Sequence, residues 1–167
     1  MDFRKDLMQS RGYGDYESLD PKLLGNVYVA YRTSLSEGTE VFHNNVRERW
    51  NRGEAEVVNS MQRWGDIALE GRKALEAGDR KTLSALINEN FDLRRRIYSI
   101  DKGNLEMIDT ARAVGASSNF AGSGGAITGL YDDEAMFGKL TEAMKPLGVK
   151  VIKPELVPLV QARQGKL

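Results

Sequence analysis

Two chemically versatile residues are scarce in this chain, which contains no cysteine and one histidine, His43. Without cysteine there is no disulfide framework, no thiolate zinc site and no cysteine nucleophile. A single histidine cannot build a metal site of several histidines, and we interpret His43 as a solvated or surface hydrogen-bonding residue. Sites that depend on sulfur ligands or on paired histidines are therefore excluded, and we expect no metal site.

The chain also lacks an excess of either charge and any long hydrophobic run. Lys and Arg together number 24, as do Asp and Glu, whereas nucleic-acid-binding proteins usually carry a basic excess. No apolar run approaches the roughly 20 residues that a membrane-spanning helix needs, and the first residues, Met1 to Asp6, lack the apolar core of a signal peptide. We therefore expect a cytoplasmic protein with no nucleic-acid or membrane partner.

What remains is the composition of an ordinary soluble protein. Of the 167 residues, 41% are hydrophobic and 29% are charged, and a chain of this length can bury a substantial core. We expect an irregular N-terminal segment over residues 1–18, one domain over residues 19–160, and a polar tail over residues 161–167.

Hydrophobic periodicity predicts that most of this domain is helical. The predicted helices cover residues 40–51, 54–77, 80–97, 105–114 and 133–147. Asp79, Asn104 and Asp132 are the predicted N-caps of the last three, because Asp and Asn side chains accept hydrogen bonds from the first amides of a helix.

Segments rich in β-branched and aromatic residues predict strands over residues 26–33, 126–131 and 149–153, and residues 116–120 form a candidate fourth strand. Strands separated by helices, with more helix than strand, indicate an α+β fold with helices on one face of a small sheet. With the fourth strand the plan is ferredoxin-like, and the sheet is mainly antiparallel.

A glycine cluster, Gly122-Ser123-Gly124-Gly125, connects a predicted helix to the predicted strand at residues 126–131. Glycine tolerates positive φ and lets a partner approach the backbone, and successive exposed amides form a concave site for an oxyanion. One interpretation is therefore an anion-facing loop. The other is a tight connection whose glycines only satisfy turn geometry.

This glycine loop matches neither common phosphate-binding template. No Lys follows Gly125, so the G-x-x-x-x-G-K-[ST] pattern is absent, and the Rossmann fingerprint requires a strand before the glycines and a helix after them. Here the predicted order is reversed. An anion at this loop would therefore not lie at the N-terminus of a helix.

Several segments in a fixed order resemble the C-terminal half of the GHMP kinase superfamily, the small-molecule kinases named after galactokinase, homoserine kinase, mevalonate kinase and phosphomevalonate kinase. Residues 121–126, Ala-Gly-Ser-Gly-Gly-Ala, resemble the third, glycine-rich motif of that superfamily. Within it, the similarity runs from about Leu19 to Pro154 and is strongest to the glucuronokinases. Four stretches carry it: Leu19-Asp20-Pro21, Val46-Arg47-Glu48-Arg49-Trp50, Asn90-Phe91-Asp92-Leu93-Arg94-Arg95-Arg96 and Val114-Gly115-Ala116.

The resemblance implies the fold of the superfamily and a division of labour between two lobes. In these kinases a P-x-x-x-G-L-G-S-S-A loop of the N-terminal lobe holds the ATP triphosphate, and the Asp and Lys of catalysis belong to the same lobe. This chain contains no P-x-x-x-G-L-x-S-S run. We therefore expect that the N-terminal lobe is missing, that no catalytic residue lies in this chain, and that the isolated chain is inactive. ATP and Mg²⁺ would be held mainly by the missing lobe, while Gly122, Ser123, Gly124 and Gly125 would line the cleft from the other side.

The resemblance to glucuronokinases also implies a substrate, glucuronate, which would be converted to glucuronate 1-phosphate. A bidentate arginine is the natural reader of a substrate carboxylate. The candidate substrate residues are Asn119, Arg32, Arg47 with Arg49, and the run Arg94-Arg95-Arg96, from which Arg95 is selected. For each arginine a solvated helix face or a surface ion pair is the competing interpretation, since three consecutive arginines on a helix point in three directions. For Asn119 the alternative is a hydrogen bond within the turn.

A function of a different class stays open. On this alternative the chain is a stand-alone binding or interaction module that keeps the kinase fold without the nucleotide lobe and binds an acidic ligand, another copy of itself or a partner chain. In an intact kinase part of this domain's surface would be covered. We therefore expect the isolated chain to expose an apolar patch and to self-associate as a homo-oligomer.

Overall fold

The computed structural model describes residues 1–33, 40–122 and 124–157, without the side chains of residues 40–44. The chain divides into two compact units. The larger unit is Leu24–Glu155, and the smaller comprises Met1–Leu23 together with the C-terminal residues from Leu156. The larger unit contains the whole sheet.

The smaller unit contains a short helix, α1 (Lys5–Arg11), where we predicted an irregular segment. Backbone hydrogen bonds close the chain around it, from Asp2 N to Asp15 O at 2.8 Å and from Asp15 N to Asp2 O at 2.9 Å. Gly12 ends the helix with a φ of 76°, a left-handed conformation that glycine adopts without strain. A helix of 7 residues carries too little hydrophobic periodicity for the sequence to reveal it.

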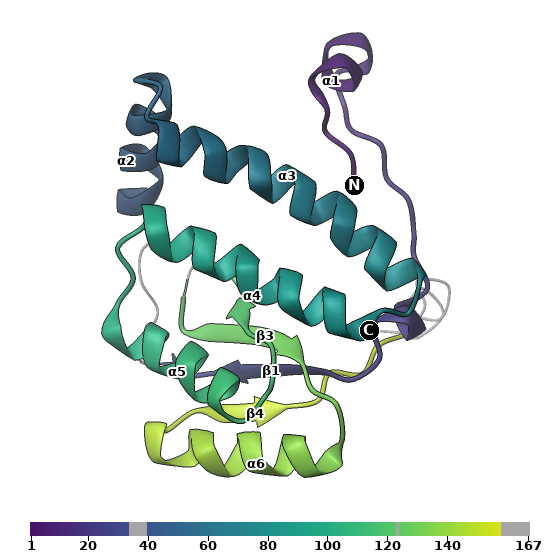
Figure 1. The fold of residues 1–167 in the computed structure, drawn as a ribbon, viewed down its shortest axis with the longest axis vertical. Helices are drawn as coiled ribbons and strands as arrows, with labels where there is room; N and C mark the ends of the chain where they lie inside the picture. Colours follow the sequence, from purple (N-terminus) through teal and green to yellow (C-terminus); the bar gives the residue numbers. More distant parts are fainter. Residues whose placement is uncertain (34–39, 123, 158–167) are drawn as a thin grey trace. The chain divides into compact units, whose positions relative to one another are not determined.

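The larger unit is built on a four-stranded sheet in the order β2-β3-β1-β4, in which every neighbouring pair is antiparallel (Figure 1). The strands are β1 (Val27–Tyr31), β2 (Asn119–Phe120), β3 (Ala126–Leu130) and β4 (Lys150–Ile152). The α+β class, the ferredoxin-like plan and the fourth strand are therefore confirmed. The fourth strand is shorter than predicted because Leu130 N donates to Ser117 Oγ, at 2.8 Å, and not to Ser117 O, which accepts from the hydroxyl of Tyr28.

The helices of this unit are α2 (Glu40–Asn51), α3 (Ala55–Glu76), α4 (Arg80–Ile97), α5 (Lys102–Ala113) and α6 (Glu134–Met144). Short 3₁₀ turns occur at η1 (Pro21–Leu24) and at η3 (Lys145–Leu147), which continues α6. Helix α3 packs beside α4 (Figure 1). Only Ala77-Gly78-Asp79 connects the two, so they run antiparallel.

Two of the three predicted N-caps are wrong by a short shift. Asp79 caps α4 as predicted. Helix α5 begins after Asp101, whose carboxylate accepts hydrogen bonds from the first amides, so Asn104 lies inside the helix. Helix α6 begins after Asp133, one residue beyond the predicted cap Asp132. Where two cap-forming residues occur close together, the pattern does not decide which of them begins the helix.

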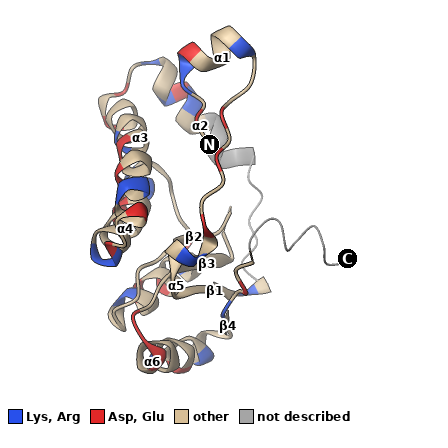
Figure 2. Cartoon of the chain, turned by 90° about the vertical axis from the view of Figure 1, so that its right-hand side faces the viewer, with Lys and Arg blue, Asp and Glu red and all other residues tan. Residues whose placement is uncertain are grey.

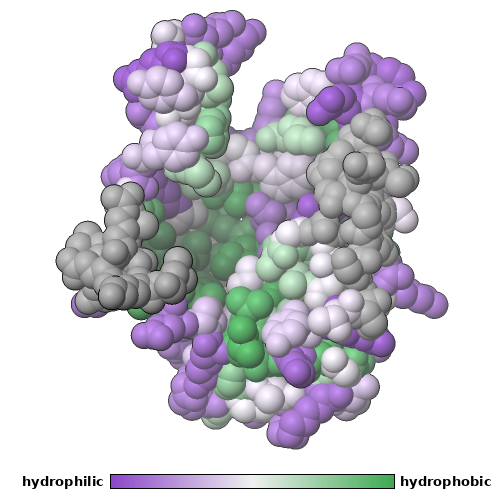
Figure 3. Space-filling view, turned by 180° about the vertical axis from the view of Figure 1, so that it is seen from behind, coloured by the Kyte–Doolittle hydropathy of each residue, from purple (hydrophilic) through white to green (hydrophobic). Residues whose placement is uncertain are grey.

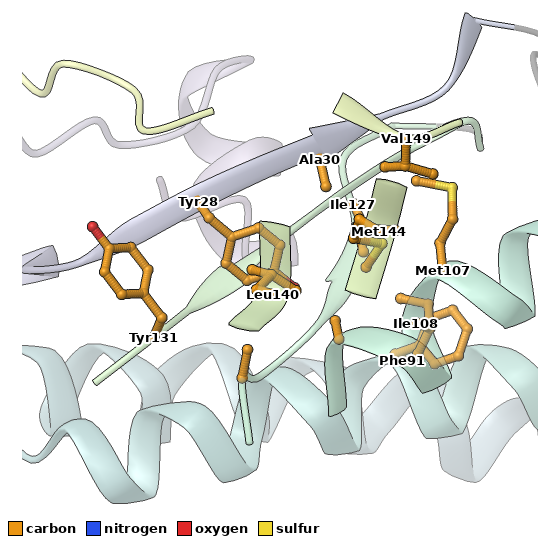
Figure 4. Close-up of a cluster of buried hydrophobic side chains, with 12 residues drawn as sticks. Tyr28, Ala30, Phe91, Met107, Ile108, Ile127, Tyr131, Leu140, Met144 and Val149 are labelled. Carbon is orange, nitrogen blue, oxygen red and sulfur yellow. The ribbon is translucent and has the colours of Figure 1, made fainter. Parts of the chain in front are cut away.

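The hydrophobic core lies between one face of the sheet and helices α4, α5 and α6 (Figure 4). Alternation along β1 places Tyr28 and Ala30 on this face, and both are fully buried. Phe91 of α4, Ile108 of α5 and Leu140 of α6 meet them from the helices and are also fully buried. The expectation of a sheet covered by helices is confirmed, and this packing fixes the two strands that the glycine loop connects.

The opposite face of the sheet is apolar along β1 and half-buried there. Val27, Val29 and Tyr31 of β1 point to it, and Ile152 of β4 is 45% exposed. Lys150 is the one Lys, Arg, Asp or Glu within the strands, whereas the helices carry many charges (Figure 2). Seen from behind, hydrophobic residues gather near the centre of the view (Figure 3). The expected self-association requires an apolar surface of this kind, and it stays a prediction.

Tyr28 makes the stability of the core sensitive to alkaline pH. Burial raises its pKa to about 12, because the phenolate would lose its hydration. In the unfolded chain a tyrosine titrates near pH 10. The neutral phenol therefore favours the folded state fully below pH 10, and we expect this contribution, about 3 kcal/mol, to be lost between pH 10 and 12.

Urea unfolding of the wild type and of Tyr28→Phe between pH 8 and 12 tests this expectation. The variant is less stable at pH 8, because it loses the hydrogen bond to Ser117 O, but its stability declines less steeply above pH 10. Tyr16→Phe, at a position that is 67% exposed, is the control and keeps the wild-type profile. If the stability of wild type and of Tyr28→Phe declined equally with pH, the raised pKa of Tyr28 would be contradicted.

Candidate functional site

The glycine loop is the turn of a hairpin between β2 and β3. Ala121 N donates to Ala126 O at 2.9 Å and closes the turn. Gly122, Gly124 and Gly125 have φ values of 102°, 137° and 73°, in a region that other residues rarely adopt. Turn geometry by itself therefore accounts for glycine at these three positions.

A buried asparagine holds the inner side of the loop. Asn104 of α5 is 1% exposed, and its Oδ1 accepts a hydrogen bond from Gly125 N at 2.8 Å. On the other side of the same residue, Arg32 N donates to Gly125 O at 2.7 Å. A Cβ on Gly124 would lie 3.2 Å from Asn104 Nδ2. The residue that we predicted as a helix cap thus fixes the conformation of the loop.

These bonds decide which backbone amides of the loop can meet a ligand. Gly125 is buried, and its amide is committed to Asn104. Gly122 is exposed, with no atom within 4 Å of the position that its Cβ would take. Ser123 lies outside the described residues. Of the predicted cofactor-binding residues, Gly122 and Gly124 are those whose amides make no hydrogen bond within the described part of the chain.

Asn119, the predicted turn or substrate residue, is engaged within the protein. Its Nδ2 donates to Asn90 Oδ1 at 2.9 Å, and its Oδ1 accepts from Phe120 N at 2.7 Å. The first bond ties β2 to α4, and the second holds the backbone of β2. Because both polar atoms of the side chain are used, the geometry favours the turn role.

The predicted substrate arginines have different surroundings. Arg32 is half-buried directly after β1, and its backbone contacts Gly125 of the loop. Arg95 is exposed on α4, 3.9 Å from Asp109. Arg47 is exposed on α2. Within the described residues, the structure brings Arg32 to the loop and shows no hydrogen bond between the loop and either of the other two.

Arg94, which we did not select from its run, contacts the loop instead. Its guanidinium carbon lies 5.2 Å from the ring centre of Phe120 and 5.7 Å from that of Tyr98. Its Nη1 donates a long hydrogen bond of 3.4 Å to Gly122 O. Burial lowers the pKa of Arg94, because withdrawal from water disfavours the charged guanidinium.

Helical periodicity carries the signal that separates Arg94 from Arg95. Residues three and four apart share a face of a helix. Arg94 lies three residues after Phe91 and three before the buried Ile97. Arg95, by contrast, lies only two before Ile97. Phe91 is fully buried. The sequence therefore contained a reason to place Arg94, rather than its neighbour, on the inner side of α4.

In the part of the chain that the structure describes, the His, Cys, Asp and Glu side chains form no group of three or more that could hold a metal ion. Within the same residues, every helix is too short or too polar to cross a membrane. What the site offers a ligand is backbone amides and an arginine, which suit an anion rather than a cation.

Comparisons of the sequence point to one kind of enzyme, although no protein-family model matches the chain. Over 130 residues, or 76% of its length, the chain is 42% identical to glucuronokinase 1 of Arabidopsis thaliana, of which it covers 36%. Over 162 residues, or 95% of its length, it is 36% identical to probable glucuronokinase 2 of the same plant, of which it covers 44%. The chain thus spans less than half the length of these curated relatives.

Solved structures of two kinases have the same fold. A mevalonate kinase of L. major, crystallised with R-mevalonate, matches 79% of the chain with a TM-score of 0.68 and 21% identity, over 44% of its own length. A phosphomevalonate kinase of Streptococcus pneumoniae matches 79% of the chain with a TM-score of 0.60 and 15% identity, over 40% of its own length. The chain is thus similar to glucuronokinases over most of its length and shares the fold of GHMP kinases.

These similarities confirm the resemblance given by the ordered motifs. The solved GHMP kinases share at most 21% of their residues with this chain in the matches above, so they establish its fold alone. The similarity to the two glucuronokinases is higher and covers most of the chain. It is therefore the stronger guide to the chemistry.

Proposed function

We propose that this chain is the C-terminal, substrate-side part of an ATP-dependent sugar kinase that phosphorylates glucuronate at its 1-hydroxyl. The observation that carries the proposal is the 42% identity to Arabidopsis glucuronokinase 1 over 130 residues. The chain lacks the P-x-x-x-G-L-x-S-S run that holds ATP in the superfamily. A second lobe therefore supplies the nucleotide site, and the isolated chain is inactive.

The residues present fit a supporting role toward ATP but not the holding of Mg²⁺. Gly122 is exposed, with open space around it, so the backbone there can approach a phosphate closely. The described residues form no group of three acidic or histidine side chains that would hold Mg²⁺ unaided. We therefore propose that the loop lines the cleft between the two lobes. Phosphoryl transfer depends on positioning, and this chain contributes the positioning of the sugar.

Of the three arginines that the sequence predicts as ligands of the sugar-acid carboxylate, Arg32 is the one proposed for that role. Arg32 has the strongest case among the residues predicted from the sequence, because it is half-buried and adjoins Gly125. Arg47 and Arg95 are exposed, and a carboxylate bound by an exposed arginine gains little in water.

A chimeric enzyme tests the proposed function. The segment of Arabidopsis glucuronokinase 1 that matches this chain is replaced by the chain itself, and ATP consumption is measured with glucuronate, galactose and mevalonate as acceptors. We expect the chimera to phosphorylate glucuronate in preference to the other two acceptors. The isolated chain, as the control, transfers no phosphate and binds ATP–Mg²⁺ weakly or not at all in calorimetry.

Two outcomes would contradict different parts of the proposal. A folded chimera that prefers galactose or mevalonate would contradict the proposal that the substrate is a sugar acid. Phosphate transfer by the isolated chain would contradict the proposal that a second lobe supplies the nucleotide site. A folded chain that binds an acidic ligand but cannot support any chimera would favour the stand-alone binding module.

A further inference from the structure

Among the partly buried arginines in the described helices, Arg94 has the fewest and longest side-chain hydrogen bonds and no ion pair. Arg49 and Arg112 are each paired with a carboxylate and also donate to backbone carbonyls. Arg80 has no carboxylate but donates to two backbone carbonyls, at 3.0 and 3.1 Å. Within the described residues Arg94 makes one hydrogen bond, at 3.4 Å, and no ion pair.

The surroundings of Arg94 hold its guanidinium in one orientation. It lies against the rings of Phe120 and Tyr98, and Phe120 in turn packs on Phe91 with ring centres 5.2 Å apart. Aromatic contacts of this kind fix a planar guanidinium and pre-organise its N–H groups. All but one of these donors are left for a partner that the described chain does not supply.

The position of this arginine is also informative. Its one hydrogen bond is to Gly122, the exposed glycine of the loop, next to which there is open space. Withdrawing a cation from water without a counter-ion is costly. An anion that arrives beside Gly122 would offset this cost.

We propose that Arg94 binds an oxyanion of the ligand, a carboxylate or a phosphoryl group, beside Gly122. The inference rests on the proposed function, since a sugar-acid kinase handles both kinds of oxyanion. The fixed plane of the guanidinium suits a bidentate contact with either group. Of the three consecutive arginines of α4, this one determines ligand affinity, and Arg95 and Arg96 are solvated.

The competing explanation is purely structural. Arg94 lies in the last turn of α4, where a cation interacts favourably with the helix dipole, and its stem covers the ring of Phe120. A structural arginine affects folding stability but not the affinity for an anion. A measurement of both quantities separates the two roles.

Calorimetric titration of the full chain tests the inference, with sodium glucuronate, glucose and inorganic phosphate as probes. Arg94→Gln removes the charge, and Arg94→Lys keeps the charge without the planar fork. Arg95→Gln is the matched control, because the same change occurs one residue away on an exposed side chain. Thermal unfolding of each variant is recorded alongside.

We expect wild type and Arg95→Gln to bind the anion equally, Arg94→Gln to bind it about tenfold more weakly or worse, and Arg94→Lys to lie between. Binding of glucose is unchanged in every variant. A loss seen with glucuronate assigns the carboxylate, and a loss seen with phosphate assigns the phosphoryl group. Equal affinity in wild type and Arg94→Gln, an equal loss in Arg95→Gln, or no anion binding by wild type would overturn the inference.

The chimeric kinase distinguishes a failure of this inference from a failure of the proposed function. If the chimera phosphorylates glucuronate, and Arg94→Gln changes neither the KM for glucuronate nor the KM for ATP, the proposed function stands and the role of Arg94 is refuted. If the chimera transfers no phosphate while anion binding to the full chain still requires Arg94, the binding role stands and the kinase function is refuted.

Discussion

Replacing Gly129 with alanine is expected to lower the free energy of unfolding by about 3 kcal/mol or more. Gly129 lies on the core-facing side of β3, paired with Tyr28 of β1. A Cβ at this position would lie 1.8 Å from Ser117 O and 3.1 Å from Tyr28 Cε1. Atoms without a bond between them do not approach so closely, so the backbone on one side has to move.

The segment that carries Ser117 cannot move without loss. Ser117 N donates to Leu130 O at 3.0 Å, and Ser117 Oγ accepts from Leu130 N at 2.8 Å. The hydroxyl of Tyr28 donates to Ser117 O at 2.9 Å in the interior. Displacing Ser117 would break these bonds where an unpaired polar group costs about 1–3 kcal/mol.

Gly138→Ala is the matched control for this prediction. Gly138 lies in α6, is exposed, and has no atom within 4 Å of the position of a Cβ. Alanine there is expected to stabilise the protein by about 0.5–1 kcal/mol, because glycine weakens a helix interior. The stability of both variants is measured by urea unfolding. A Gly129→Ala protein as stable as wild type would contradict the prediction, because it would show that a Cβ fits between β3 and Ser117.

Replacing Gly124 with valine is expected to lower the free energy of unfolding by about 2–3 kcal/mol. The φ of Gly124 is 137°, and holding a residue other than glycine in such a region costs about 1–3 kcal/mol. The new Cβ would also lie 3.2 Å from Asn104 Nδ2. If the glycine instead served only the approach of a ligand, the variant would unfold like the wild type.

A double-mutant cycle separates these two costs. Asn104→Ala leaves the buried amide of Gly125 without its acceptor, for a loss of about 1–3 kcal/mol. If valine at position 124 also clashes with Asn104, the double variant loses less stability than the sum of the two single changes. An additive result would assign the whole effect of Gly124→Val to the backbone conformation.

The fold could largely be predicted because its signals are local. Leu93 and Ile97 recur at helical spacing along α4, and Gly78 follows the preceding helix with a φ of 69°. The uncharged run Val27–Tyr31 is a strand by composition alone. Each of these elements can be recognised from the residues within it.

The candidate site could be predicted only in part, because contacts between distant segments decide its geometry. Asn104 and Gly125 are 21 residues apart, and nothing near Asn104 distinguishes a helix cap from a side chain that holds a loop. Arg94 and Arg95 have the same chemistry; helical spacing places Arg94 on the inner side of α4, but only the structure shows that it reaches Gly122 of the loop. The need for glycine at position 129 depends on the carbonyl of Ser117, and the strand pattern does not show how closely that carbonyl approaches.

Strand β1 has a consequence for how the chain is made. Its partners on both sides, β3 and β4, follow much later in the sequence, since Tyr31 pairs with Ala126 and with Lys150. A ribosome that adds about 5–20 residues per second needs roughly 5–20 s to deliver the first of them. Throughout that interval Val27–Tyr31 is an uncharged, β-prone segment with both edges bare, which can pair with other nascent chains. Synthesis is therefore a stage at which this strand is exposed to aggregation.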